Sequence, residues 1–336
     1  MIPPASLARS SRGLRLDASG TSFKAIRTSP TSEQAQGSSR ALYWDRHIIV
    51  HNKESGRHCQ NYGIAAAGPE KLSPARPHLG PVLQDIQDRF HLAELPYQVH
   101  RLDKNTTGAL LLARTSQRAK ELARDFRQHK IHKTYHALVL NGENPLAQGD
   151  HGEATLWHHL DADNRPHSVS AGTKGAREAK TQWRVLGLSE HSQVALLELK
   201  PTTGFKHQLR LACAHKLGRP ILGDLLHGRL HPLTTESYPL SHDDTSRGAS
   251  ESNPAAHDYK GMFLHASRLS VTRFRRTGPS KRLQLTIGAP LPPEWIAFCN
   301  FLGIELPPEL VEGGVWVDGQ RVADGRVPEL DGEWIW

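Results

Sequence analysis

The chain has 336 residues and a formal net charge of +8. About 37% of the residues are hydrophobic and 23% are charged, which is typical of a globular protein and not of a fibre or a wholly disordered chain. No run approaches the roughly 18 apolar residues that a membrane-spanning helix needs, so we expect no membrane insertion. The three scattered cysteines, Cys59, Cys213 and Cys299, suggest no disulfide framework and favour a reducing or organellar interior.

The charge is distributed unevenly along the chain. Residues 1–40 hold six basic and two acidic residues in a Ser- and Arg-rich stretch. This composition is typical of a mitochondrial transit peptide, although a disordered basic tail would look the same. Residues 301–336 hold eight acidic and two basic residues. The excess positive charge therefore lies in residues 41–300, and it predicts a polyanionic partner, with nucleic acid first and a membrane surface second.

Strand and helix patterns alternate without an internal repeat. In chain order, we expect a strand at 47–51, a helix from Pro81, a helix capped at Thr115-Ser116, strands at 134–140 and 194–199, a helix around 209–213 closed by Gly218, and a hairpin at 315–322. Residues 229–260 lack an apolar period and are predicted to form an inserted, mobile loop. Trp316, Trp334 and Trp336 are interpreted as contacts that hold the C-terminal extension to the main body.

Two groups of polar residues receive plain interpretations. The basic residues of the second helix, Arg118, Lys120, Arg124 and Arg127, are interpreted as a solvated face. The chain contains 21 histidines, but none of them belongs to a recognisable metal-ligand pattern. Glycine-rich nucleotide-binding motifs are missing as well. We therefore predict neither a metal nor a cofactor.

The segment 99–113 (VHRLDKNTTGALLLA) has an unusual character. Asp103 lies between Arg101 and Lys104, ahead of an apolar strand. Nearby cations favour the ionised form of a carboxylate, and an ionised, positioned carboxylate can act as a nucleophile or a base. A structural salt bridge at a loop–strand junction is the alternative, and the spacing by itself favours it.

This segment resembles the His-Arg-Leu-Asp-x-x-Thr-Ser-Gly signature of the RluA family of pseudouridine synthases. Further segments resemble the family in the same order: 51–56 (HNKESG), 133–139 (KTYHALV), 201–210 (PTTGFKHQLR), 220–224 (PILGD) and 264–266 (LHA). The resemblance covers about residues 41–300. Glu54 replaces the usual Pro, Thr107 the usual Ser, and Phe205-Lys206 the usual Arg-Thr. The last change removes a cation beside the site, although Lys206 retains one a position away.

The resemblance implies an α+β pseudouridine synthase fold, with a central, mixed, largely antiparallel sheet, flanking helices and a basic active-site cleft. It implies the isomerisation of uridine to pseudouridine in structured RNA, which needs no metal, redox agent or energy source. Asp103 corresponds to the family's catalytic aspartate; whether it first attacks the sugar, attacks the base or abstracts a sugar proton stays open. Arg210 matches the arginine that pairs with the aspartate, and Tyr135 matches the tyrosine that stacks on the target base.

The same resemblance supplies the expected substrate-binding residues, which are Arg101, Leu209, His207, Gln208, Lys133 and Gly204. Leu209 would form part of the apolar floor of the pocket. Arg101, His207 and Gln208 would hold phosphate or backbone. A purely structural role at the start of a helix is an equal alternative for His207 and Gln208.

We expect three parts: a transit peptide at 1–40, a catalytic domain at 41–300 with its insertion at 229–260, and an acidic, Trp-containing extension at 301–336. The expected protein is a monomer of the mitochondrial matrix, with the cytoplasm or nucleus as alternatives. Its expected partner is RNA, with organellar large-subunit ribosomal RNA first and mitochondrial tRNA second.

Two other functions compete with this interpretation. One is a non-catalytic RNA-binding assembly factor, which Phe205-Lys206 favours and the set of Asp103, Tyr135 and Arg210 opposes. The other is a glycoside or nucleoside hydrolase, which would release free base. Sugar hydrolases usually use two carboxylates, and no second carboxylate obviously accompanies Asp103.

Overall fold

The structure, a computed structural model, describes residues 40–59, 77–142, 144–190, 193–228, 261–275 and 280–336. The predicted transit peptide, apart from Arg40, and the predicted insertion at 229–260 lie outside the described residues. Among the helices that are described, none is both long enough and apolar enough to cross a membrane.

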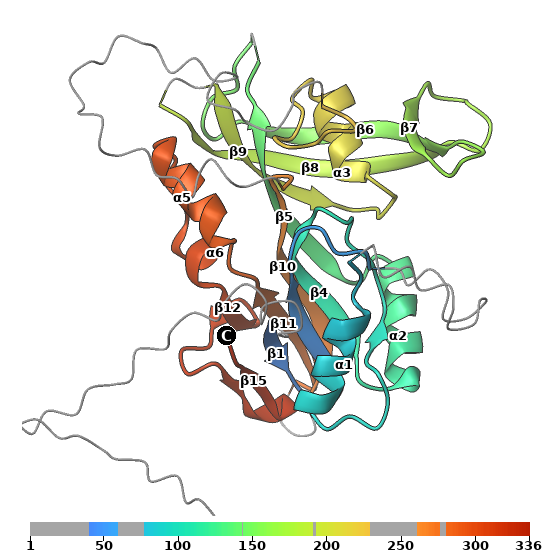
Figure 1. Cartoon of the computed structure of the whole chain (residues 1–336), viewed down its shortest axis with the longest axis vertical. Helices are drawn as coiled ribbons and strands as arrows, with labels where there is room; N and C mark the ends of the chain where they lie inside the picture. The colour runs from blue at the N-terminus through green and yellow to red at the C-terminus, as the bar shows by residue number, and fades with distance from the viewer. Residues whose placement is uncertain (1–39, 60–76, 143, 191–192, 229–260, 276–279) are drawn as a thin grey trace, which may run out of the picture. The chain divides into compact units, whose positions relative to one another are not determined.

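The described strands form one mixed sheet (Figure 1). Its main path, in spatial order, is β14 (Arg326–Val327), β15 (Gly332–Trp334), β1 (Ala41–Trp44), β2 (Ile48–Lys53), β4 (Thr107–Ala113), β10 (Leu264–Phe274), β5 (His132–Leu140), β9 (Val194–Pro201), β8 (Arg177–Leu188), β6 (His151–Leu160) and β7 (Pro166–Val169). Off this path, β3 (Tyr97–Gln98) pairs with β4, while β11 (Arg282–Gly288) joins β10 to the hairpin of β12 (Gly314–Val317) and β13 (Gln320–Arg321). Among these pairs, only β4 with β10 is parallel. The predicted mixed, largely antiparallel sheet is confirmed.

Strand β4 lies at the centre and is buried along its whole length. Leu110 and Leu112 pack with helix α1 (Gly80–Arg89), whereas Leu111 belongs to a second cluster that includes Leu122 of α2 (Ser116–Arg127). Alternate side chains of a strand point to opposite faces, so burial on both faces explains the continuous apolar run. Gly108 has a φ of +108°, and a Cβ there would lie 2.3 Å from the Ala266 carbonyl oxygen, so the close approach of β4 to β10 requires glycine.

The helices begin close to where the sequence predicts. The first begins around Pro81, and the second is capped by Thr115, whose hydroxyl accepts the Arg118 N–H at 3.2 Å. Helix α3 (Gln208–Leu211) continues into a π-helical turn at Ala212–Lys216. Gly218 follows with a φ of +67°, as expected of a residue that ends a helix.

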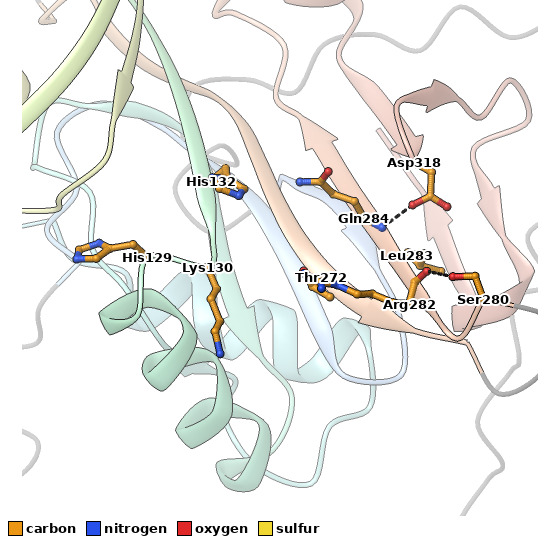
Figure 2. Close-up of a pocket in the computed structure, with 9 residues that line it drawn as sticks. All are labelled: His129, Lys130, His132, Thr272, Ser280, Arg282, Leu283, Gln284 and Asp318. Atoms are coloured by element: carbon orange, nitrogen blue, oxygen red, sulfur yellow. Dashed lines mark hydrogen bonds between the residues drawn. The ribbon is translucent and has the colours of Figure 1, made fainter. Parts of the chain in front are cut away.

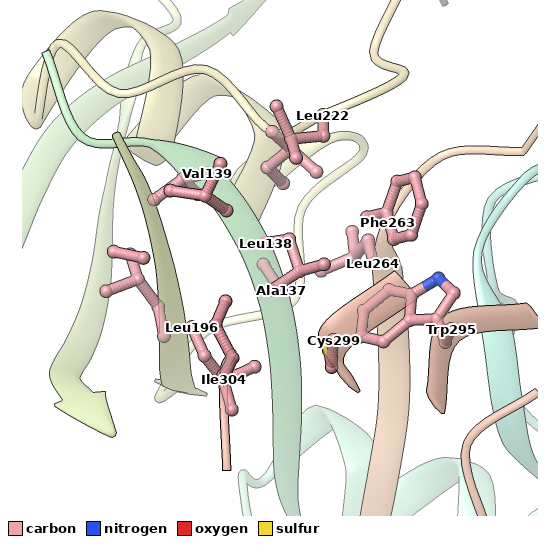
Figure 3. Close-up of a cluster of buried hydrophobic side chains, with 14 of the residues drawn as sticks. Ala137, Leu138, Val139, Leu196, Leu222, Phe263, Leu264, Trp295, Cys299 and Ile304 are labelled. Atoms are coloured by element: carbon pink, nitrogen blue, oxygen red, sulfur yellow. The ribbon is translucent and has the colours of Figure 1, made fainter. Parts of the chain in front are cut away.

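The largest apolar cluster lies where β5, β9 and β10 meet helix α5 (Pro293–Phe301) (Figure 3). Phe263 packs against Trp295 and Phe298, with ring centroids 5.2 and 5.0 Å apart. Leu138 of β5 and Leu196 of β9 are fully buried in the same cluster. This core fixes β5, whose Tyr135 packs against the same cluster.

The C-terminal strands belong to the same sheet. Helix α6 (Pro308–Glu312) precedes the predicted hairpin, whose turn residues Asp318 and Gly319 both have positive φ. Trp316 lies under the guanidinium groups of Arg268 and Arg321, and Trp334 packs against the cluster that contains β1. Trp336, the third tryptophan of this extension, is 54% exposed.

Candidate active site

The loop between β3 and β4 carries Asp103. The side chain of Lys53 binds the backbone of this loop. The Lys53 ammonium donates to the carbonyl oxygens of Lys104 at 2.9 Å and Thr106 at 2.8 Å. The Thr106 N–H in turn donates to the Asp103 carbonyl at 3.1 Å. Burial lowers the pKa of Lys53 to about 8. The loop that presents Asp103 is therefore ordered by hydrogen bonds that leave its carboxylate free.

Two further contacts fix the ends of this loop. The buried Cys59 thiol accepts the Leu102 N–H at 3.3 Å, and the Gly56 N–H donates to the Lys104 carbonyl at 2.9 Å. The turn that follows β2 therefore lies directly against the Asp103 loop. Segments 51–56 and 99–113, which are far apart in the sequence, are thus in direct contact.

Arg210 lies between two carboxylates. Its Nε and Nη2 donate to Asp224 at 2.8 and 2.6 Å, and its Nη1 lies 3.6 Å from Oδ2 of Asp103. Asp224 is almost fully buried, and the N–H groups of Leu226 and His227 also donate to it, at 3.1 Å each. Although burial would raise the pKa of Asp224, the Arg210 hydrogen bonds hold it below its usual value. Asp224 thus aims the guanidinium, and Asp103 faces it as an ion pair.

Tyr135 and Leu209 form the apolar side of the same site. Tyr135 projects from β5, and burial together with the charge of Asp103 raises the pKa of its phenol. Leu209 of α3 is 7% exposed and lies in the largest apolar cluster. A flat, uncharged ring and an apolar floor therefore lie on the same side of the site as the Asp103 carboxylate.

His207 lies at the start of α3 in the left-handed region, with a φ of +53°. Its Nε2 lies 3.9 Å from Oδ2 of Asp103, and its Nδ1 lies 3.0 Å from Nε2 of His227. Burial and the positive charge of Arg210 lower the pKa of His207 to about 3. At neutral pH it therefore contributes a neutral ring beside Asp103 and adds no charge.

Gln208 orders the loop that precedes α3. Its carbonyl oxygen accepts from the Thr203 hydroxyl at 2.8 Å and from the Phe205 N–H at 3.1 Å. Its amide nitrogen donates to the Lys180 carbonyl at 3.0 Å and to the Thr181 hydroxyl at 3.2 Å. These contacts tie the loop to β8 and occupy both ends of the amide.

These side chains meet in a cavity of about 610 Å³, which we call the catalytic cavity. All nine site residues expected from the sequence line it: Arg101, Asp103, Lys133, Tyr135, Gly204, His207, Gln208, Leu209 and Arg210. Among its described lining residues, Asp103 is the only carboxylate, while six are basic: Arg101, Arg127, Lys133, Arg177, Lys206 and Arg210. A single negative charge in a cationic cavity suits a polyanionic substrate.

Sequence reasoning missed several residues of this region. Arg127, interpreted as part of a solvated helix face, lines the cavity together with Phe126. Asp224 is the last residue of segment 220–224, so the motif contained it without revealing its partner. His158 and Arg177 come from β6 and β8 and lie in no recognised segment, so no sequence signal pointed to them.

A second cavity of about 610 Å³ adjoins the first and shares His129 with it (Figure 2). Lys130 and His132 line one side, and Arg282 and Gln284 of β11 line the other. Its one carboxylate among the described lining residues, Asp318, is paired with Arg275 at 3.0 Å. Lys130 and Arg282 make no ion pair with any described carboxylate, so this cavity is cationic.

Comparison with known proteins agrees with the fold. The RNA pseudouridylate synthase family matches residues 47–215. The mouse (Mus musculus) protein named pseudouridylate synthase RPUSD4, mitochondrial, is 32% identical over 287 residues, which cover 80% of this chain and 71% of that protein. The protein named tRNA pseudouridine synthase C of Yersinia pestis is 35% identical over 196 residues, covering 56% of this chain and 70% of its own length.

A solved structure supports the fold. The structure of human RNA pseudouridylate synthase domain containing 4 superposes with a TM-score of 0.55 at 24% identity, covering 80% of this chain and 94% of that one. The fold is that of the pseudouridine synthases. The chain belongs to the RluA-type RNA pseudouridylate synthase family, and it is an RNA-modifying isomerase.

Proposed function

We propose that this chain converts uridine to pseudouridine with Asp103 as the reacting carboxylate, Arg210 as its ion-pair partner and Tyr135 as the ring that stacks on the base. The observation that carries the proposal is the arrangement of Asp103, the only carboxylate among the described residues of a basic cavity, within 3.6 Å of a guanidinium that Asp224 aims. The two parallel hydrogen bonds to Asp224 fix the orientation of the Arg210 guanidinium. This arrangement holds Asp103 ready to act on one nucleoside.

The reaction is balanced without a cofactor. The bond between N1 of uracil and C1′ of the ribose breaks, the uracil turns within the cavity, and a bond forms between C5 and C1′. The C5 proton leaves and a proton is taken up at N1. Because the pKa of Tyr135 is raised, its phenol stays protonated at neutral pH, so Asp103 is the better acceptor for the C5 proton.

A uridine must leave its stack before it can enter the cavity. Flipping a base out of a structured RNA costs a few kcal/mol. Stacking on an aromatic ring is worth about 1–3 kcal/mol per base, and Tyr135 offers such a ring next to the floor formed by Leu209. Lys133, Gly204 and Arg101, which line the same cavity, complete the proposed substrate-binding set.

The second cavity extends the proposal to the rest of the RNA. Its cations, Lys130 and Arg282, adjoin the catalytic cavity through His129. Cations that neutralise phosphates supply most of the sequence-independent affinity for nucleic acid. The RNA backbone beside the target uridine therefore has a path across this surface.

The proposed target is mitochondrial large-subunit ribosomal RNA, with mitochondrial tRNA as the alternative. The basic, acid-poor residues 1–40 favour an organellar destination. The name of the mouse relative includes the word mitochondrial, which supports the compartment. The name of the Yersinia pestis relative includes tRNA, which supports the alternative substrate.

Mapping of pseudouridines tests this proposal. Organellar and cytosolic RNAs are mapped in cells that lack the chain and in cells to which it is restored. We expect one or a few sites to lose and regain pseudouridine in organellar ribosomal RNA. If the maps are identical, the chain acts as a non-catalytic RNA-binding assembly factor, the function that Phe205-Lys206 favours.

Release of free uracil by the purified protein would indicate hydrolysis instead. A reporter fused to residues 1–40 that stays in the cytosol would contradict the targeting.

A further inference from the structure

Phe205 replaces an arginine of the family motif, and the structure shows what its ring contacts. The ring stacks on His158, with centroids 5.1 Å apart and planes inclined by 21°. The guanidinium carbon of Arg177 lies 4.5 Å from the centre of the same ring. Phe205 also packs against the small apolar cluster that contains Leu156 and Ala179. Residue 205 therefore carries no positive charge itself, but its ring contacts the guanidinium of Arg177, which comes from β8.

The sheet explains why both partners reach Phe205. His158 of β6 and Arg177 of β8 lie directly opposite each other in an antiparallel register. Residues that face each other in this way have their side chains on the same face of the sheet. Nε2 of His158 also lies 2.9 Å from the Lys206 carbonyl. The paired strands β6 and β8 therefore pack against the loop before α3, and the Phe205 ring lies at this contact.

Lys206 does not replace the missing arginine. Its ammonium donates to the carbonyl oxygen of Asn164 at 2.7 Å, which directs it to the turn between β6 and β7. Arg177, by contrast, is exposed, lines the catalytic cavity and forms no ion pair with any described carboxylate. The guanidinium on this side of the cavity is that of Arg177.

We propose that Arg177, held over the ring of Phe205, binds a phosphate of the RNA strand next to the target uridine and so replaces the cation that the family motif places at position 205. This inference rests on the proposed function of the cavity. Arginine presents planar N–H donors that match phosphate oxygens. The contact with the Phe205 ring uses none of the guanidinium N–H donors in a hydrogen bond, and Arg177 is exposed, so these donors can reach a phosphate.

Binding of a fluorescein-labelled RNA hairpin with uridines in its loop, measured against salt concentration, tests the inference. A phosphate contact is independent of sequence, so the true target is not needed. Arg177→Gln should weaken binding several-fold and reduce the slope of log Kd against log salt by about one. Phe205→Leu, which leaves Arg177 charged but unsupported, should weaken binding less. Arg326→Gln is the matched control, because Arg326 is exposed on β14 at the other end of the strand order.

The decisive variant returns the positive charge from position 177 to position 205. Arg177→Gln combined with Phe205→Arg should restore the slope and most of the affinity. If the double variant folds with an unchanged Tm but does not recover, the inference is wrong. If it does not fold, Arg177→Lys decides: a slope like that of the wild type supports a phosphate contact, and a slope like that of Arg177→Gln overturns it.

Two other results would also overturn the inference. The first is an unchanged Kd and slope in Arg177→Gln. The second is a weaker Kd with an unchanged slope, which would mean that Arg177 stacks on a base. Because the readout is binding, it is separate from the proposed function: a protein that binds RNA through Arg177 and makes no pseudouridine refutes the isomerase proposal alone.

Discussion

The two cavities have the same volume, and among the described lining residues of each the Lys and Arg side chains outnumber a single carboxylate, by six to one in the catalytic cavity and by two to one in the second; the two carboxylates, however, are held in opposite ways. In the catalytic cavity a second, buried acid, Asp224, takes the hydrogen bonds of Arg210, so Asp103 faces that guanidinium across 3.6 Å and the neutral ring of His207 across 3.9 Å. In the second cavity Asp318 is itself the partner of Arg275 and also accepts the Gln284 N–H at 2.8 Å.

A carboxylate is available for chemistry when its own oxygens are not tied up in hydrogen bonds while its neighbours are held in place. Asp318 is engaged by Arg275 and by the Gln284 N–H, and its side chain is half exposed to water. The groups around Asp103 are held in place by other residues. Lys53 binds the backbone of the loop that carries Asp103, and Asp224 binds the Arg210 guanidinium. Groups that are positioned in advance need no reorganisation when charge develops in the reaction.

Replacing Asp103 or Asp318 with the corresponding amide should give the largest difference in reaction rate. Asp103→Asn should lower the single-turnover rate of pseudouridine formation by at least about 10³-fold, as removal of a reacting group does. RNA affinity should stay within a few-fold of wild type. Asp318→Asn should change the rate by no more than about twofold, as expected of a substitution at the surface. Equal losses in the two variants would contradict the assignment of Asp103.

Exchanging the two arginines tests the aiming role of Asp224. Arg210→Lys keeps the positive charge but cannot form two parallel hydrogen bonds with Asp224, so the group facing Asp103 shifts. A misplacement of about 1 Å can cost roughly 10²-fold in rate, and we expect a loss of that size in rapid-quench assays. Arg275→Lys, in the exposed pair with Asp318, is the control and should leave the rate unchanged. A fully active Arg210→Lys variant would show that charge alone suffices.

Acid should destabilise the fold through its buried histidines. Burial lowers the pKa of His136 and His100 to about 3 and that of His265 to about 4. The folded chain keeps them neutral while the unfolded chain takes up protons below a pH of about 6.5. Their stabilising contribution is therefore complete above that pH and is lost as the pH falls towards 4 and 3.

Thermal unfolding measured across this pH range checks the effect. Tm should decrease between pH 6.5 and 4, and His136→Gln should make the decrease shallower while lowering Tm at neutral pH, because the bond to Ser267 at 2.6 Å changes. His132→Gln, on the same strand but exposed, is the control. An identical decrease in the wild type and in His136→Gln would remove His136 as a cause.

The smallest effect concerns the second cavity as a binding surface for RNA. Lys130→Gln and Arg282→Gln should each weaken hairpin binding a few-fold and reduce the salt slope by about one. The reason is that each removes a cation that has no partner among the described carboxylates. Arg326→Gln serves again as the control. Slopes equal to that of the wild type in both variants would separate this cavity from the path of the RNA.

Much of this architecture was predictable from the sequence. The capping residue Thr115, the turn at Asp318-Gly319 and the apolar run of β4 are local signals, and each gave an element close to the observed one. All nine expected site residues line one cavity because the recognised segments keep their order and chemistry. The exposure of Trp336 was not predictable, since an aromatic residue near a chain end does not reveal whether anything covers it.

The sequence by itself determined the family, the mixed sheet and the identity of the residues around Asp103, because short motifs record which side chains a reaction needs. Only the tertiary structure decided how those side chains are held. The clamp of Asp224 on Arg210, the support of the Asp103 loop by Lys53 and the meeting of Arg177 with Phe205 all join residues that are distant in the chain. Pairings of this kind depend on strand register and on the packing of one element against another, and no local pattern of residues specifies either.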